Sequence, residues 1–189
     1  MKVATIDFET DAIVNGSPTP PKPVGVAIKL GGKASKYLAW GHAIENNCKR
    51  SEAKTAIKDA LKWCDRVVYH NAKFDLSVMA HWLDIHPNGT YTTFDTMIMA
   101  FLNNPHEKSL GLKQLADTLL DMAPEEQQDL RDWIMKNVKE ASDKNWGAFI
   151  AKAPAKLVGK YAKGDTDRTF ALYNLYIESM EKDEREMRA

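Results

Sequence analysis

The feature that most constrains the fold is a short apolar run that begins almost at the first residue, Val3 to Phe8. It is rich in residues that favour strands, so we predict a strand buried in the centre of a sheet. Two acidic residues, Asp7 and Glu9, lie at the end of this strand. Because side chains alternate along a strand, both acids should point to one side, while Phe8 packs into the opposite layer.

The pattern that follows predicts a mixed sheet with helices packed on it, an α/β fold. Residues 24–30 and 36–40 should form an antiparallel meander with the first strand, and residues 66–70 a further buried strand. Helical spacing and helix-start signals predict helices over residues 51–63, 73–83, 96–102, 110–120, 124–138 and from 156 to at least 180. The length suits a single domain, residues 1–189.

Composition excludes several classes of protein. With 44% hydrophobic and 28% charged residues, the chain has the composition of a soluble globular protein. It has neither an apolar run of membrane-spanning length nor a signal peptide, so we expect no membrane association. The two cysteines, Cys48 and Cys64, are too far apart for a paired metal motif. We interpret them as free thiols in a reducing cytoplasm.

Charge by itself does not predict a nucleic-acid partner, because 26 basic residues balance 26 acidic ones. Residues 136–163 are locally basic, however, with Glu140 and Asp143 as their acids. This segment fits either a guide for a polyanion or an ordinary solvated surface. Its seven lysines are Lys136, Lys139, Lys144, Lys152, Lys156, Lys160 and Lys163.

Two further motifs place polar residues one helical turn apart. Asn71 and Asp75 follow the strand at 66–70, with Asn71 at a natural cap position. Tyr161 and Asp165 have the same spacing in the last helix. Gly164 lies between them and costs up to ~1 kcal/mol in a helix, which predicts close approach of another backbone or of a ligand. Alone, each motif is also explained by helix capping or a solvated surface.

Two nearby polar residues have simpler explanations. Asp95 precedes a predicted helix, so we interpret it as a cap rather than an additional metal ligand. His70 ends a buried strand and is expected to be a satisfied structural histidine rather than a base.

In combination and in this order, the three motifs resemble those of the DEDD superfamily of 3′–5′ exonucleases. The chain is similar to the proofreading exonuclease domain of family A DNA polymerases, of the polymerase I and phage type. The stretches around Phe94-Asp95-Thr96-Met97 and Ser109-Leu110 also resemble that family. A related branch has a histidine five residues before the last aspartate, where this chain has Lys160, which indicates the tyrosine branch. The polymerase domain itself is absent from the chain.

The resemblance implies a ribonuclease H-like mixed sheet of about five strands, the first three antiparallel, flanked by helices. It implies a two-metal 3′–5′ exodeoxyribonuclease that releases 5′-mononucleotides, with Mg²⁺ or Mn²⁺ as the two divalent ions. The implied metal ligands are Asp7, Glu9, Asp75 and Asp165. Tyr161 is the implied group that orients water. Thr10, Ile13 and Asn71 are the implied substrate contacts.

The resemblance also implies partners and leaves alternatives open. We expect a monomer that acts on the 3′ end of single-stranded DNA, with a polymerase domain or subunit as a further partner. The expected location is the cytoplasm of a bacterium or a phage-infected host. An RNA 3′ exonuclease resembling ribonuclease D is the first alternative. An inactive nucleic-acid-binding scaffold is the second, and the presence of all four acids and the tyrosine argues against it.

Overall fold

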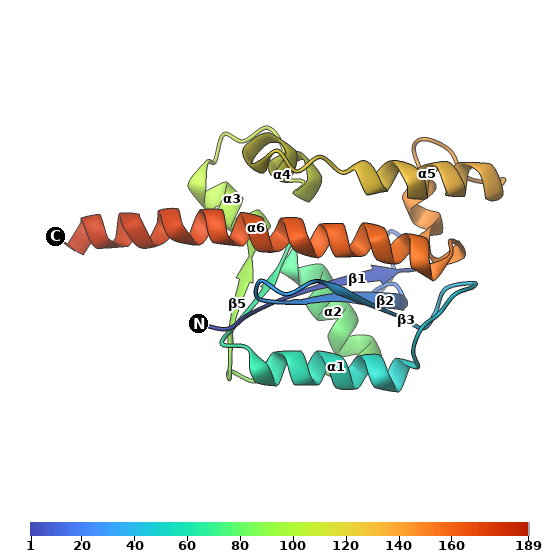
Figure 1. The fold of residues 1–189 in the computed structure, drawn as a ribbon, viewed down its shortest axis with the longest axis horizontal. Helices are drawn as coiled ribbons and strands as arrows, with labels where there is room; N and C mark the ends of the chain where they lie inside the picture. The colour runs from blue at the N-terminus through green and yellow to red at the C-terminus, as the bar shows by residue number, and fades with distance from the viewer. Residues whose placement is uncertain (189) are drawn as a thin grey trace.

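A central sheet lies between two layers of helices (Figure 1). The computed structural model describes the backbone of residues 1–188 and the side chains of residues 1–180. The strands are β1 (Val3–Thr10), β2 (Pro23–Leu30), β3 (Lys36–Ala39), β4 (Arg66–Tyr69) and β5 (Thr92–Asp95). Their order across the sheet is β3-β2-β1-β4-β5. The opening strand is therefore central, as its apolar sequence predicts.

The sheet is mixed in direction. β1 pairs antiparallel with β2, and β2 pairs antiparallel with β3, which confirms the expected meander. β4 is parallel to β1, and β5 is parallel to β4. The range of β5 was not identified from sequence, because its four residues, TTFD, contain a single large apolar side chain and none of them is buried.

Helices cover both faces of the sheet. Their bounds are α1 (Arg50–Trp63), α2 (Ala72–Leu83), α3 (Thr96–Asn103), α4 (Leu112–Leu120), α5 (Glu125–Asn137) and α6 (Ala155–Arg188), with a 3₁₀ helix, η1 (Trp146–Lys152), before α6. α1 and α2 lie on one side of the sheet, whereas α6 crosses the other side beneath α3, α4 and α5 (Figure 1). The six predicted α-helices are present with boundaries within two residues of those expected where an end was specified, and η1 was not predicted.

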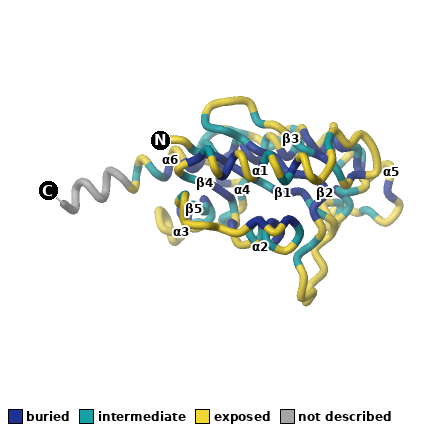
Figure 2. The backbone as a smooth tube through the Cα atoms, turned by 90° about the horizontal axis from the view of Figure 1, so that it is seen from below, coloured by how far each residue is buried: buried dark blue, intermediate teal, exposed yellow. Residues whose placement is uncertain are grey.

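Separate apolar cores fill the two sides of the sheet. Phe8, Ile57 and Met79 belong to the core beneath α1 and α2. On the other side, Ile134 lies in a core shared by α5 and α6, and Leu172 lies in one shared by α3, α4 and α6. Figure 2 shows these buried segments as dark blue stretches through the middle of the molecule. Fully burying each such side chain contributes roughly 1.5–3 kcal/mol, and the two cores that include α6 residues hold this helix against the sheet.

Cys48 and Cys64 are free thiols, as expected. Within the described part of the chain, no helix combines the length and the apolar character needed to cross a membrane.

Candidate active site

The acid pair lies where β1 extends past its parallel neighbour. β1 pairs with β2 through Thr10 but with β4 only over Val3 to Thr5, so Asp7 and Glu9 lie beyond the β4 pairing. Phe8, between them, is 4% exposed and packs in the core under α1 and α2. The alternation of side chains therefore directs both carboxylates to the side of the sheet covered by α6.

Helix α6 completes a compact group of carboxylates. Oxygen atoms of Asp7, Glu9 and Asp165 all lie within 4.8 Å of one another. Glu9 is 7% and Asp165 6% exposed, so little water surrounds these charges. Carboxylate oxygens at this spacing are the hard ligands that Mg²⁺ and Mn²⁺ prefer. The donor set therefore fits a divalent cation.

Asp75 lies beside this group rather than in it. It is in the first turn of α2 and is 2% exposed. The backbone N–H of Phe8 donates to its Oδ1 at 2.9 Å, which fixes the carboxylate against β1. The negative charge of Asp7 is among the causes that raise the pKa of Asp75, so the two carboxylates interact. The structure thus brings all four predicted acids to one place, three of them within mutual reach of a single ion.

The cluster is electrostatically unfavourable without a cation. Burial, followed by the charge of Asp165, raises the pKa of Asp7 to about 8. Burial and then Asp7 raise the pKa of Glu9 well above its ordinary value, and the pKa of Asp75 is raised for the same reasons. Burial also raises the pKa of Asp165, with Lys113 opposing it. Bound divalent cations relieve both the burial cost and the repulsion.

Tyr161 lies close enough to the carboxylates to interact with them electrostatically, and two other side chains contact it. The amine of Lys113 donates to its Oη at 3.0 Å, and the ring of Trp146 in η1 packs edge-on with the centroids 6.4 Å apart. Burial, and next the charge of Asp165, raises the pKa of Tyr161 well above its usual value. The side chain is therefore a neutral phenol, which can orient a water molecule but is a poor base.

Arg168 is a second cation near the cluster that sequence reasoning missed. It is 4% exposed, and its Nη1 lies 3.4 Å from Asp165 Oδ1. It also forms a two-bond ion pair with Glu126 at the start of α5 and donates to two carbonyl groups before that helix. Arg168 thus ties α6 to the α4–α5 connection. Its position three residues after Asp165 was the available sequence signal.

The ion pair between Arg168 and Glu126 accounts for the glycine at position 164. The expectation that another backbone or a ligand approaches this glycine closely is wrong. A Cβ at this position would lie 2.5 Å from Glu126 Oε1 and 2.8 Å from Arg168 Nη1. The close neighbours are thus side chains of this chain, not another backbone or a ligand.

Asn71 does not cap α2 with its side chain, contrary to expectation. It occupies the N-cap position with left-handed backbone angles, φ 66° and ψ 57°. The carboxylate of Asp95 instead accepts the backbone N–H groups of Asn71 and Ala72, at 3.0 and 2.8 Å. Asp95 also caps α3 through the N–H of Met97, which confirms its interpretation as a cap. The exposed side chain of Asn71 is therefore left available to a ligand.

His70 pairs with Thr96, at 2.8 Å between Nδ1 and Oγ1, and burial lowers its pKa. These contacts agree with the structural role expected for this histidine.

An open cavity of about 640 Å³ adjoins Glu9. Thr10 and Ile13 line one side, and Phe74 and Lys144 also contribute. Ile13 is 68% exposed, so its apolar side chain is accessible to a ligand in this cavity. All of the predicted substrate contacts except Asn71 line this cavity.

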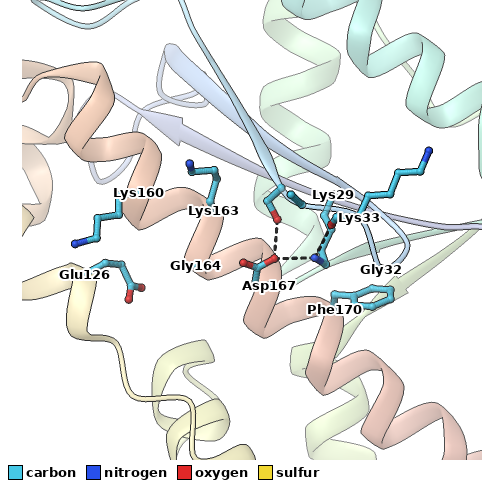
Figure 3. Close-up of a pocket in the computed structure, with 11 residues that line it drawn as sticks. Lys29, Gly32, Lys33, Glu126, Lys160, Lys163, Gly164, Asp167 and Phe170 are labelled. Carbon is cyan, nitrogen blue, oxygen red and sulfur yellow. Dashed lines mark hydrogen bonds and ion pairs between the residues drawn. The ribbon is translucent and has the colours of Figure 1, made fainter.

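The basic segment does not converge on this cavity. Of its seven lysines, Lys144 lines it. Lys160 and Lys163 line a different cavity of about 860 Å³, between α6 and the β2–β3 turn, where Lys29 pairs with Asp167 (Figure 3). Lys160 is paired with Asp129. The distribution favours a mixed surface over one continuous track for a nucleic-acid strand.

Lys113 is the other cation of the site that the sequence analysis did not identify. It falls in the stretch after Ser109-Leu110, which was noted only for its resemblance to the exonuclease family. The available signal was a lysine in the first turn of a helix, where the helix dipole disfavours positive charge.

Comparison with solved structures shows the fold. The Brucella melitensis NrnC structure with bound Mg²⁺ matches with a TM-score of 0.61 and 21% identity over 98% of this chain and 77% of that one. The family B DNA polymerase of the archaeon Pyrobaculum calidifontis matches with a TM-score of 0.64 and 16% identity over 93% of this chain and 24% of its own. Escherichia coli RNase D gives 0.58 and 13%, over 95% of this chain and 40% of its own.

A search of curated proteins gives no match. The 3′–5′ exonuclease family matches residues 2–179, nearly the whole chain, and this match agrees with the acidic cluster at the end of β1. The chain belongs to the 3′–5′ exonuclease family, which uses divalent metal ions.

Proposed function

We propose that this protein removes nucleotides from single-stranded or frayed DNA 3′ ends and releases 5′-mononucleotides. The observation that carries the proposal is the convergence of Asp7, Glu9 and Asp165 within 4.8 Å, with Asp75 and Tyr161 beside them. Two divalent ions would activate a water molecule and neutralise the charge that develops on the leaving oxygen. The water loses a proton to solvent as its oxygen forms a bond to phosphorus, the P–O3′ bond breaks, and the departing 3′ oxygen takes up a proton from solvent.

Each side chain has a proposed role that follows from its position. Asp7, which interacts with both Asp165 and Asp75, would contribute to holding both ions. Glu9 and Asp165 would hold the ion that activates the attacking water. Asp75, whose carboxylate is fixed by the hydrogen bond from Phe8, would hold the second ion partly through water. Tyr161, a neutral phenol, orients the water by a hydrogen bond.

The cavity beside Glu9 is the proposed site of the terminal nucleotide. Ile13 presents an apolar side chain that can wedge against the last nucleobase. Thr10 lines the same cavity. Lys144 lies across the same cavity and is placed to attract a backbone phosphate. Asn71 does not line this cavity, but its side chain is not used to cap α2 and is a further proposed polar contact of the substrate.

RNA is the second candidate substrate, because RNase D, described as an exoribonuclease, and NrnC, solved with pGG, share the fold. We expect a DNA oligonucleotide labelled at its 5′ end to yield a ladder of shorter products, at a rate at least about tenfold above that for RNA of the same sequence. The measurement is product length against time with Mg²⁺ and Mn²⁺. If RNA is digested faster than DNA of the same sequence, the proposed substrate is wrong and RNA takes its place.

Chelation separates an enzyme from an inactive scaffold in the same assay. We expect no ladder in excess chelator and recovery on adding Mg²⁺. Binding without hydrolysis of either polymer, with metal present, would favour the scaffold and contradict the proposed activity.

The exposed Ile13 leads to a separate prediction about the state of the 3′ end. A wedge favours ends whose last base is already unpaired, so mismatched termini should be cut faster than matched ones. Ile13→Ser should reduce cleavage of paired ends more than that of single strands, by roughly 5- to 30-fold, because one apolar contact is worth about 1–2 kcal/mol. Val14→Ser, with the same 68% exposure one residue further on, is the control. If Ile13→Ser slows cleavage of paired and single-stranded 3′ ends equally, Ile13 does not act as a wedge.

We further propose that residues 1–189 form one exonuclease domain that acts as a monomer. A polymerase domain or subunit remains a proposed partner, since the exonuclease fold occurs within the family B polymerase above. Size-exclusion chromatography coupled to light scattering would test the monomer.

A further inference from the structure

Lys113 extends from the first turn of α4 into the acidic cluster. Its Nζ lies 2.7 Å from Asp165 Oδ2 and 3.0 Å from Tyr161 Oη. The same atom is 4.1 Å from the centroid of the Tyr161 ring. The side chain is 21% exposed, so it is largely held by these contacts.

The two cations of the site differ in their partners. Arg168 is 3.4 Å from Asp165 but directs its main ion pair to Glu126. Among the side chains that the structure describes, the amine of Lys113 forms its ion pair and hydrogen bonds with Asp165 and Tyr161. Its place at the positive end of a helix is unfavourable, so these tertiary contacts must outweigh the helix dipole.

The contact of Lys113 with Asp165 conflicts with a metal ion, whereas its contact with Tyr161 does not. An ammonium at 2.7 Å from Oδ2 occupies the side of Asp165 that a cation would approach, and the two positive charges repel each other. Tyr161 carries no charge, so its hydrogen bond with Lys113 can persist. An ammonium has no acceptor, so the phenol hydrogen must point away from Lys113 toward another acceptor in the site.

We propose that Lys113 is a positioning residue with two roles: it is the internal counter-ion of Asp165 in the protein without metal, and it yields Asp165 to the metal while keeping Tyr161 oriented for hydrolysis. The inference rests on the proposed function for its second role and on geometry alone for its first. The two roles predict that a single substitution of Lys113 strengthens metal binding and lowers turnover. A lysine with a purely structural role would not produce this combination.

The test is Lys113→Met, which keeps the length of the side chain and removes its charge and its donors. Calorimetric titration with Mn²⁺ alone should show binding about tenfold tighter than in the wild type, because no ammonium must be displaced. Turnover at saturating Mn²⁺ should fall by about tenfold or more, because Tyr161 loses the bond that orients it. In a Tyr161→Phe background, the same substitution should change turnover by less than about threefold, since the two residues act as one unit.

The chain offers a matched control in Lys29 of β2, a lysine whose ion-pair partner lies on the same helix as Asp165. Lys29 pairs with Asp167 at 2.9 Å, two residues beyond Asp165, and is 11% exposed (Figure 3). Lys29→Met should leave both Mn²⁺ affinity and turnover within about twofold of wild type. Lys113→Arg, which keeps a charge and donors, should retain wild-type Mn²⁺ affinity within about threefold and part of the turnover.

Unchanged or weaker Mn²⁺ binding by Lys113→Met would overturn the counter-ion role. Undiminished turnover, or an equal loss in the Tyr161→Phe background, would overturn the positioning role. Thermal melting verifies folding, and Lys113→Gln replaces the Met variant if that one does not fold. If the wild type hydrolyses no nucleic acid, the proposed function fails, while the Mn²⁺ comparison still decides the counter-ion role.

Discussion

Asp7→Ala is expected to lose more than about 1,000-fold in turnover at saturating metal. Removing one hydrogen-bond donor from a catalytic site costs on the order of 100- to 1,000-fold, and Asp7 is proposed to hold both ions at once. Its carboxylate also interacts with Asp165 and Asp75, so no neighbouring acid can replace it without leaving its own position. Single-turnover digestion of a labelled oligonucleotide over a range of Mn²⁺ concentrations measures the loss.

The same variant should be folded and, in chelator, more stable than the wild type. The reason is that burial, followed by the negative charge of Asp165, raises the pKa of Asp7 to about 8. The advantage should shrink when Mg²⁺ is added. Asp59→Ala, on the exposed side of α1, is the control and should match wild-type activity. If Asp7→Ala retains more activity than Tyr161→Phe, Asp7 is not at the centre of the site.

The second large effect is the pH dependence of stability in the protein without metal. Asp7 titrates near 3.8 when unperturbed and at about 8 in the folded protein, and Glu9 and Asp75 are raised in the same direction. An acid with a raised folded pKa favours folding while it is protonated. Its contribution is fully present below pH about 4 and is lost as pH rises to about 8. Chelated protein should therefore become less stable from mildly acidic to mildly alkaline pH.

The expected loss in the free energy of unfolding over this pH range is on the order of 3 kcal/mol, or roughly 10 °C in Tm for a domain of this size. Glu9 and Asp75 contribute in the same direction as Asp7, whereas Lys113 opposes the raised pKa values of Asp7 and Glu9. Thermal melts in chelator at several pH values measure the loss. Asp7→Asn should flatten the curve, and saturating Mg²⁺ should restore stability at alkaline pH, where the carboxylates are ionised. A chelated wild type that gains stability over this range would show that the cluster is not desolvated as described.

The sequence determined those features that depend on local pattern. The apolar run Val3 to Phe8 could be stable only in the middle of a sheet, and the alternation of its side chains placed Asp7 and Glu9 on one side. The i, i+4 spacing likewise placed Tyr161 and Asp165 on one face of a helix. The order of these motifs indicated the exonuclease family, and the family match agrees with it.

The tertiary structure decided every contact made between distant segments. The edge strand β5 has no apolar pattern of its own and is defined by pairing with β4. Asp95 caps α2 from 23 residues away, because β5 ends beside that helix, and this displaces Asn71 from the role its position predicted. Lys113 is unfavourable in its own helix and meets Asp165, 52 residues on, because α4 packs against α6. Local sequence patterns do not predict such pairings, because their energy arises from charges and backbone groups that folding brings together.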